Sequence, residues 1–373
     1  MTRGLMPSGG SPYLPDGLDT PALVVDLDVA EANTRRLVAH LAPRGVELRP
    51  HAKTHKSIAL ARGQLDAGAR GITVGTLGEA EVFAAGGITD LFLAYPIWAV
   101  GPKAARLRAL HERTPMIVGV DSVAGAERLA AAVGDLPTPL RVLIELDPGN
   151  HRTGVTSAET AVGVATAAQG LGLGVLGVFT HAGHAHSSPE ARVSGAADEV
   201  RVLGEAAAAL RGVGFGCTVV SAGSTPTMLD AVGGEVTEMR AGTYLLGDRQ
   251  QAVLGSIKFE DVALHVAATV VSTSVPGQVV LDAGAKTLTK DRAPYLAGHG
   301  FLPAYPDAVI ERVSDYHGIV HIPPGTSAPH LGEVVAIMPN HVCPVVDLFD
   351  TFTAVRGRTV VGTWPVDARG KRG

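Results

Sequence analysis

A lysine-rich segment, LRPHAKTHKS, follows an apolar run and contains the first residues that could do covalent chemistry. Lys53 and Lys56 stand among histidines and hydroxyls, and the segment holds no acidic residue to neutralise them. Residues 46–50 read as the end of a buried strand, so the lysines follow its carboxyl end, where α/β folds bind ligands. A lysine there can form a Schiff base with an aldehyde cofactor or a carbonyl substrate. Taken alone, these ten residues favour a solvated basic loop, and it is the rest of the chain that favours the reactive lysine.

Three further polar segments follow apolar runs. DPGNHRTG carries Arg152, and THAGHAHS carries His181, His184 and His186. SAGSTPT surrounds Gly223 with small residues and hydroxyls, namely Ser221, Ser224, Thr225 and Thr227. Such a loop can turn backbone N–H groups and hydroxyls toward a phosphate, although turns of this composition are common.

The segment NHVCP places His341 and Cys343 two residues apart. On a strand, this spacing puts both side chains on one face. Imidazole and thiolate together suit Zn²⁺, but two ligands are too few for a structural zinc site. Water, substrate or another histidine would have to complete the coordination shell of the metal ion. The alternative is a buried cysteine beside a surface histidine.

Eight apolar runs separated by Ala-rich segments of helical spacing position these residues. The runs span 22–26, 46–50, 71–75, 91–95, 116–120, 142–146, 175–179 and 218–222. Strand-helix alternation predicts a parallel sheet, and eight units in about 200 residues favour a (β/α)8 TIM barrel over an open sheet. SAGSTPT, after the eighth run, then lies where many barrels bind phosphate.

Near Lys258 the pattern changes to β-branched runs separated by Gly, Pro and Asp turns. This pattern predicts a second, mostly antiparallel β domain. We therefore expect a barrel over residues 20–255 and a C-terminal β domain over 256–373, which residues 1–19 join.

The bulk composition excludes several classes of partner. The chain has 373 residues, a formal net charge of −5 and no long basic run, so neither nucleic acid nor an anionic membrane surface is expected. No apolar stretch is long enough to cross a bilayer, and the first twenty residues lack the apolar core of a signal peptide. Two cysteines suit a reducing, cytoplasmic compartment.

Taken together, these segments resemble the D-threonine aldolase and D-serine dehydratase family, pyridoxal 5'-phosphate (PLP) enzymes of the alanine-racemase-like fold (fold type III). The resemblance runs in the family's order from DTPALVVDLDVAEAN at 19–33 to PNHVCPVVDLFD at 339–350. Between these ends lie RPHAKTHK, ELDPGNHRTGV, THAGHAHS, SAGSTPT, EMRAGTYLLGD and LDAGAKTLTKD. The fold implied is a (β/α)8 barrel with a β domain, which the hydrophobic pattern predicts independently.

The resemblance also implies roles for matching residues. Lys53 would carry PLP, and His181 and His184 would act as catalytic residues facing cofactor and substrate. The remaining cofactor contacts would be Arg152 near the ring, Ser221, Gly223, Ser224 and Thr225 at the phosphate, and Tyr244 and Asp248 closing the site. His341 and Cys343 match a pair that holds a divalent metal beside the substrate's β-hydroxyl, with Zn²⁺ ahead of Mn²⁺ or Mg²⁺.

The implied activity is that of a metal-assisted lyase on D-3-hydroxy amino acids. The HxC pair is closer to the dehydratase branch, which releases a keto acid and ammonia, than to the aldolase branch, which releases glycine and an aldehyde. Tyr316 stands where the family pattern has Glu, and Asp347 where it has Asn, so the substrate stays open. The family also implies a homodimer.

Three rival functions remain. A racemase of the same fold would need no metal. A non-catalytic PLP carrier would need neither the second domain nor the HVC motif. A barrel metallohydrolase would use His181, His184, His186 and the C-terminal pair without PLP.

Overall fold

The chain forms two compact units in the computed structural model, which describes residues 13–373. Of the described residues, unit 1 contains 13–30 together with Leu246–Gln250 and Phe259–Val366. Unit 2 contains Glu31–Leu245, Gln251–Lys258 and Asp367–Gly373. No helix of the described residues is long and apolar enough to span a membrane.

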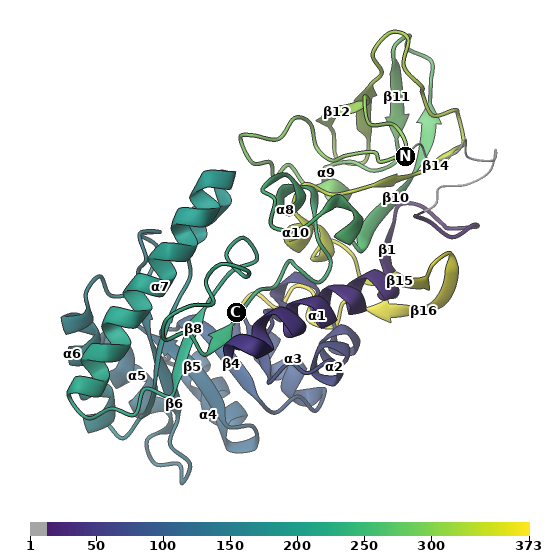
Figure 1. The fold of residues 1–373 in the computed structure, drawn as a ribbon. Helices are drawn as coiled ribbons and strands as arrows, with labels where there is room; N and C mark the ends of the chain where they lie inside the picture. The colour runs from purple at the N-terminus through teal and green to yellow at the C-terminus, as the bar shows by residue number, and fades with distance from the viewer. Residues whose placement is uncertain (1–12) are drawn as a thin grey trace. The chain divides into compact units, whose positions relative to one another are not determined.

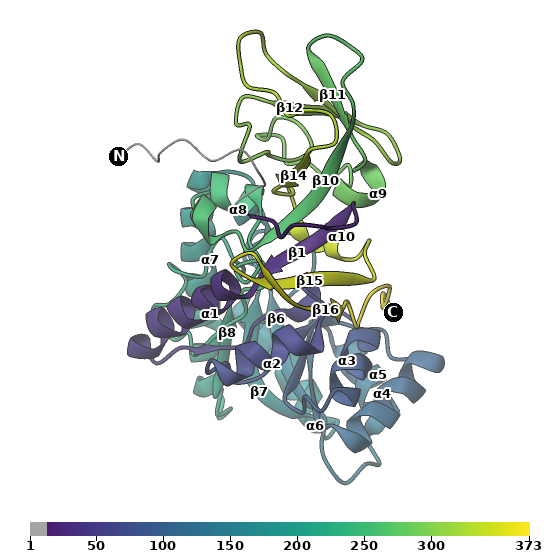
Figure 2. The same ribbon diagram turned by 90° about the vertical axis from the view of Figure 1, so that its right-hand side faces the viewer.

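Unit 2 is built on a parallel sheet of eight strands in the order β2-β9-β8-β7-β6-β5-β4-β3 (Figures 1 and 2). Its strands are β2 (Glu47–Leu48), β3 (Ile72–Val74), β4 (Leu91–Pro96), β5 (Met116–Val120), β6 (Arg141–Leu146), β7 (Gly174–Thr180), β8 (Val219–Ala222) and β9 (Glu238–Met239). A parallel bridge between His51 and Thr73 links the chain after β2 to β3, the other end of this order. The predicted (β/α)8 barrel is therefore confirmed.

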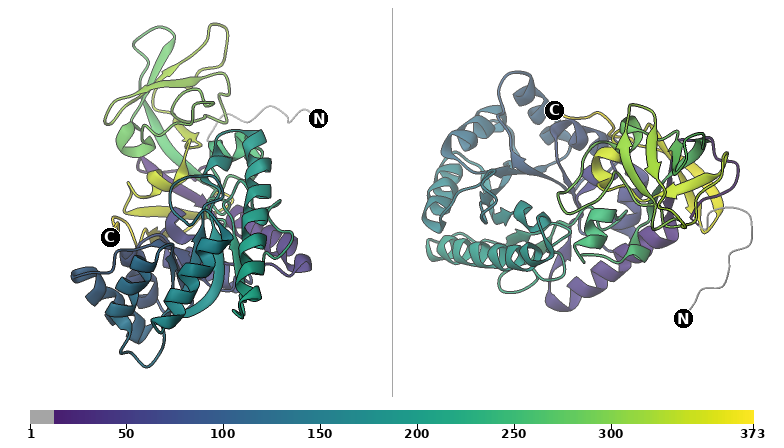
Figure 3. Two further views of the ribbon diagram at one scale, coloured as in Figure 1. Left: turned by 90° about the vertical axis from the view of Figure 1, so that its left-hand side faces the viewer. Right: turned by 90° about the horizontal axis from the view of Figure 1, so that it is seen from above.

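The helices of unit 2 surround these strands, as Figure 3 shows. They are α1 (Leu27–Leu41, which starts in unit 1), α2 (Ile58–Asp66), α3 (Leu77–Ala85), α4 (Pro102–Arg113), α5 (Val123–Val133), α6 (Ala158–Gly170) and α7 (Pro189–Gly212). Short 3-10 turns lie at Ala42–Arg44, Ala52–Thr54 and Gly183–His186. Hydroxyl side chains begin four of the helices by accepting a backbone N–H of the first turn, at Thr76, Ser122, Ser157 and Ser188.

Inside the barrel an aromatic pair fixes the packing of the strands. The Phe92 and Phe179 rings meet edge to face, with centroids 5.1 Å apart, and both are fully buried. Burying each ring stabilises the fold by about 1.5–3 kcal/mol. Gly119 is required beside them, because a Cβ there would lie 2.6 Å from Phe179 Cζ.

Unit 1 contains a mostly antiparallel sheet in the order β12-β13-β11-β10-β1-β15-β16, with β14 also paired to β10. Its strands are β1 (Ala22–Asp26), β10 (Leu264–Ser272), β11 (Gln278–Leu281), β12 (Val309–Val313), β13 (Gly318–His321), β14 (Val334–Ile337), β15 (Thr351–Arg356) and β16 (Thr359–Pro365). Short helices are α8 (Arg249–Val253, shared with unit 2), Phe259–Asp261, α9 (Ala285–Leu288) and α10 (Val342–Val346). Only the pairing of β1 with β15 is parallel in the described part of this sheet.

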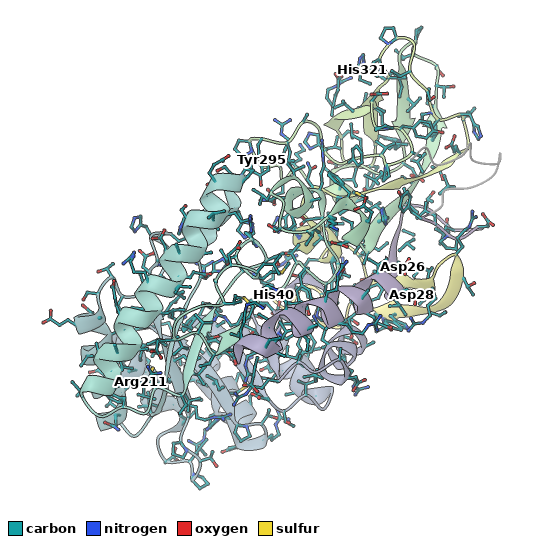
Figure 4. The ribbon with its side chains drawn as sticks, in the orientation of Figure 1. Asp26, Asp28, His40, Arg211, Tyr295 and His321 are labelled. Carbon is teal, nitrogen blue, oxygen red and sulfur yellow. The ribbon has the colours of Figure 1, made fainter. Side chains whose placement is uncertain are left out.

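The assignment of β1 as the first barrel strand is wrong. Its residues pair with β10 and β15 in unit 1, and β9 takes the remaining barrel position. Strand β9 has only two residues, Glu238 and Met239, which is too short to produce an apolar run. Unit 2 consequently begins at Glu31, whereas we placed the start of the barrel at residue 20. Asp26 lies directly before α1, and its Oδ1 accepts the N–H of Asp28 at 2.9 Å. Figure 4 labels both residues.

Candidate active site

Lys53 lies just beyond the carboxyl end of β2, in the middle of the 3-10 turn Ala52–Thr54. His51 begins this turn, and its Nδ1 accepts the N–H of Lys53 at 3.4 Å. The Lys53 side chain is exposed, whereas both neighbours in the turn are buried. The fold therefore presents this amine at the ligand-binding end of the barrel strands.

Lys56 occupies a different environment from the solvated one we expected. It is 7% exposed, and its Nζ lies 3.4 Å from Glu79 Oε1. Glu79 is buried in the first turn of α3, and its Oε2 accepts the N–H of Gly75 at 2.7 Å. Burial raises the pKa of Glu79, and Gly75 and Lys56 oppose that shift. The neutralising carboxylate is distant in sequence, so the segment around Lys56 contains no sign of it.

Two imidazoles share the electrostatic environment of Lys53. Burial lowers the pKa of His51 well below its usual value, and the charges of Lys53 and Arg240 lower it further. His181 shows the same effect, with burial first and then Lys53 and Arg152. Both rings are therefore neutral at physiological pH, and the surrounding charge is positive. The charges of Lys53 and Arg152 thus act on His181, and those of Lys53 and Arg240 act on His51, while the catalytic roles of these residues stay predictions.

The other two histidines of THAGHAHS have partners outside this cluster. His184 Nε2 lies 3.5 Å from Asp198 Oδ2 on α7, and its Nδ1 is buried without a hydrogen-bond partner. His186 Nδ1 lies 3.3 Å from Gln251 Nε2. The catalytic role assigned to His184 stays a prediction, and its contacts are those of a residue that fixes the loop to α7.

The predicted phosphate loop is held by internal hydrogen bonds. The Gly223 N–H donates to Glu199 Oε1 at 3.1 Å, and the Ser224 N–H donates to Thr227 Oγ1 at 3.2 Å. Thr225 Oγ1 accepts the N–H of Tyr244 at 3.1 Å. Gly223 has φ +114°, and a Cβ there would lie 2.2 Å from Met239 Sδ. Glycine is thus required here for close packing against Met239 of β9.

Arg240 is a buried cation that the sequence reasoning missed. Its Nη1 donates to Ser221 Oγ at 2.6 Å, and its guanidinium lies over the Phe92 and Phe179 rings. The Ser221 hydroxyl itself donates to Glu238 Oε1 at 2.6 Å, so it serves this internal network. Arg240 directly follows β9 in the segment EMRAGTY, the position where barrel strands place site residues. Because β9 is not predicted from the sequence, this position is not recognised.

A buried carboxyl on β6, Glu145, lies within the electrostatic influence of Arg152 on the loop that follows. Glu145 Oε1 accepts the hydroxyl of Thr153 at 2.9 Å, and its Oε2 is buried without a hydrogen-bond partner. Burial raises the pKa of Glu145 to about 7, against the opposing effects of Thr153 and Arg152. Arg152 is exposed and acts electrostatically on both Glu145 and His181.

Tyr244 and Asp248, both predicted to close the cofactor site, belong to different units. The Tyr244 hydroxyl accepts Gln64 Nε2 at 2.8 Å inside unit 2, and burial raises the pKa of Tyr244 to about 12. Asp248 is buried in unit 1, where its Oδ2 accepts the N–H of Val342 at 3.0 Å. Asp248 thereby stabilises the start of α10.

His341 and Cys343 lie at the start of α10 and not on a strand, so the predicted local structure is wrong. His341 is the last residue before the helix, and Pro344 fits within its first turn. The side chains still meet, because Cys343 hydrogen-bonds His341. His341 Nδ1 also lies 2.5 Å from Asp291 Oδ2, on the loop that Tyr295 marks in Figure 4. Burial alone would lower the pKa of His341, but Cys343, Asp248 and Asp291 raise it to about 10.

Two sequence departures also lie in unit 1. Tyr316 is 62% exposed in the turn between β12 and β13, and its hydroxyl accepts Lys286 Nζ at 3.0 Å. Asp347 ends α10. No group of three or more His, Cys, Asp and Glu residues suited to a metal ion occurs within residues 13–373.

Comparison with known proteins agrees with this architecture. The family model for the alanine racemase N-terminal domain matches residues 25–250, and a putative serine dehydratase domain matches residues 263–355. The D-threo-3-hydroxyaspartate dehydratase of Delftia sp. (strain HT23) is 38% identical, over 93% of this chain and 97% of its own. The D-threonine aldolase of Arthrobacter sp. is 34% identical, over 95% and 93%.

Solved structures give the same result. The D-threonine aldolase of Filomicrobium marinum superposes with a TM-score of 0.87 at 34% identity, covering 95% of this chain and 97% of its own. A cysteine-to-alanine mutant of D-threo-3-hydroxyaspartate dehydratase, in the metal-free form, gives 0.83 at 35% identity, covering 93% and 97%. The chain belongs to the D-threonine aldolase and D-serine dehydratase family of alanine-racemase-like enzymes, as its motifs predicted. It is an enzyme of the lyase class.

Proposed function

We propose that this enzyme is a PLP-dependent dehydratase of D-3-hydroxy amino acids, with D-threo-3-hydroxyaspartate as the first substrate to test. The observation that carries the proposal is the exposed Lys53 amine in a positively charged setting at the carboxyl end of the barrel. The relatives with dehydratase and aldolase names support a lyase acting on such substrates.

The residues of unit 2 fit an anionic aldehyde cofactor. Lys53 supplies a primary amine, Arg152 and Arg240 supply positive charge, and His51 and His181 are kept neutral by burial and those cations. These cations would attract the phosphate of such a cofactor. Lys53 would hold PLP through its amine, with Arg152 near the ring and Thr225 near the phosphate. When bound, PLP supplies an electron sink for negative charge at the substrate's Cα.

The side chains of unit 2 then divide the work of proton transfer. Once the substrate's amine has replaced it on the cofactor, the freed Lys53 Nζ would take the Cα proton, since a neutral primary amine is an effective general base. The neutral His181 ring hydrogen-bonds the substrate without adding charge. Arg240 donates to Ser221 and lies buried over two aromatic rings, and the carboxyls of Glu238, Glu199 and Glu145 act on its charge, so it fixes the end of β8 beside the site.

The donor set of unit 1 fits a divalent metal. A thiol and an imidazole form the pair, and an imidazole held by a carboxylate at Nδ1 offers Nε2 to a metal. His341 and Cys343 would hold the ion and leave its other positions open, with Zn²⁺ preferred for its affinity for sulfur. Its chemistry would be that of a Lewis acid on the β-hydroxyl. The metal-free form of the dehydratase mutant supports this assignment.

Product identification tests the proposal. Purified enzyme with PLP and Zn²⁺ is incubated separately with D-threo-3-hydroxyaspartate, D-serine and D-threonine. We expect ammonia and a keto acid in equal amounts, and no turnover by Lys53→Ala. Glycine with an aldehyde would instead establish the second candidate, aldol cleavage, which the D-threonine aldolase relatives favour. Interconversion of enantiomers with neither product would establish a racemase and refute both.

The homodimer expected from the family remains a proposal. Light scattering at working concentration should give twice the chain mass, and a monomer alone would contradict it.

A further inference from the structure

A buried carboxylate on α7, Glu199, binds the backbone of two separate loops of unit 2. Its Oε1 accepts the N–H of Ala182 at 3.0 Å and the N–H of Gly223 at 3.1 Å. Its Oε2 accepts the Thr227 hydroxyl at 2.7 Å. The side chain has no solvent exposure. One carboxylate therefore connects the chain after β7 with the chain after β8.

Both loops carry residues of the candidate active site. Ala182 directly follows His181, and Gly223 directly precedes Ser224 and Thr225. Thr227 extends the connection, because its Oγ1 also accepts the N–H of Ser224 at 3.2 Å. The direct contact between the loops is weak, since His181 Nδ1 and the Gly223 carbonyl oxygen are 3.5 Å apart. Glu199 thus adds a link between the two loops to the pairing of β7 with β8 and to the contacts of Arg240 with Thr180 and Ser221.

Packing alone does not explain an acid at this position. The other buried positions of α7 are taken mostly by Ala and Leu, including Leu203, Ala206 and Ala207. Burying a carboxylate is costly unless several hydrogen bonds compensate it. Burial raises the pKa of Glu199, and Thr227, Ala182 and Arg240 oppose that shift. The three donors and the nearby cation account for how the fold accommodates the charge.

We propose that Glu199 is a positioning residue that fixes His181 and the 223–225 loop relative to each other by binding both loops through one carboxylate. The link to PLP rests on the proposed function, while the link between the loops does not. Removing the carboxylate frees two backbone N–H groups and a hydroxyl, so both loops should open more often.

Three variants and one control test this role in the full chain. Glu199→Ala removes all three hydrogen bonds. Glu199→Gln keeps Oε1 as the acceptor shared by the Ala182 and Gly223 N–H groups. The new amide N–H can donate to Thr227 Oγ1, and the Thr227 hydroxyl can then donate to Ser224 Oγ, which lies 3.2 Å away. Thr227→Val removes only the hydroxyl arm. Gly204→Ala is the matched control, because it lies on the same helix and an added Cβ there meets nothing within 4 Å.

Two readouts are measured for each protein. Hydrogen exchange without added cofactor should speed up by about tenfold or more at residues 181–187 and 222–228 in Glu199→Ala, and less in Thr227→Val. Absorbance titration should show PLP binding about 10- to 100-fold weaker in Glu199→Ala. Glu199→Gln should stay within about threefold of the parent in both readouts, and Gly204→Ala should match the parent.

Each alternative outcome overturns the positioning role. Unchanged exchange at both segments in Glu199→Ala means that the loops do not depend on Glu199. Faster exchange throughout unit 2, without rescue by glutamine, makes Glu199 an ordinary core residue. If Glu199→Ala does not fold, Thr227→Val decides, and unchanged exchange at 222–228 refutes the role. Failure of the parent to bind PLP refutes the proposed function alone, since the exchange result stands without cofactor.

Discussion

The buried ion pair between Lys56 and Glu79 predicts a large loss of stability when either partner is removed alone. Their side chains are 9% and 3% exposed, and Lys56 has a positive φ of 51°. In Lys56→Ala, Glu79 would remain buried with the Gly75 N–H as its hydrogen-bond donor and without its cation. Breaking a buried pair in this way costs about 3–5 kcal/mol.

The loss is large enough to measure by thermal unfolding. For a unit of this size, each kcal/mol moves the Tm by about 2–4 °C, so Lys56→Ala should lower the Tm by about 6–20 °C. The matched variant is Lys53→Ala, only three residues away. Because the Lys53 side chain is exposed, its loss should change the Tm by no more than about 2 °C.

A double-mutant cycle separates the interaction energy of Lys56 with Glu79 from any effect of the substitutions on the backbone at Lys56, which has a positive φ. Glu79→Gln keeps an acceptor for Gly75 but leaves Lys56 without its carboxylate. The double variant with Lys56→Ala removes both charges, so it should be more stable than the sum of the single losses predicts, by about 1–3 kcal/mol. Additivity within about 0.5 kcal/mol, or equal Tm values for Lys56→Ala and Lys53→Ala, would refute the buried pair.

Three other predictions concern residues of the two units taken separately. The pKa of Glu145 is raised from 4.5 to about 7, so the folded state holds its proton while the unfolded state loses it, and stability falls as pH rises from about 4.5 to 7. Glu145→Gln should remove about 3 kcal/mol of that fall, and identical pH profiles of unfolding free energy would contradict the shift. Gly223→Val should lower both the Tm and PLP affinity by displacing Met239, and an unchanged Tm would show that β9 can move to accommodate the added side chain. Cys343→Ala or chelation should abolish turnover while Tm and PLP absorbance change little; full activity after confirmed metal removal would eliminate the metal's role, and unfolding on chelation would make it structural.

The barrel was predictable because its apolar runs alternate with helical segments at regular intervals. The errors arose where a segment with the same local pattern pairs with strands other than those of the barrel. Residues 22–26 have the apolar character of a barrel strand, yet they pair with β10 and β15, which lie far along the chain. Strand β9 has two residues and no apolar run, so nothing local distinguishes it from a loop.

The same limit applies to the site residues. Lys53 could be proposed from its place after a strand, but the burial of Lys56 depends on Glu79, and the Gly223 N–H bond depends on Glu199. Glu79 lies on α3 and Glu199 on α7. The local sequence of these helices does not distinguish the two carboxylates from ordinary helical residues. His341 and Cys343 were found from their spacing, although a helix start brings them together rather than a strand.

The central claim is that Lys53 binds PLP at the mouth of the barrel, and borohydride reduction followed by peptide mapping tests it most directly. The parent protein and the Lys56→Ala variant are loaded with PLP, reduced, digested and analysed by mass spectrometry. We predict one pyridoxyl group on Lys53 in both proteins and none in Lys53→Ala. A pyridoxyl group on Lys56 or another lysine, or no label in a protein that turns over substrate, would contradict the account.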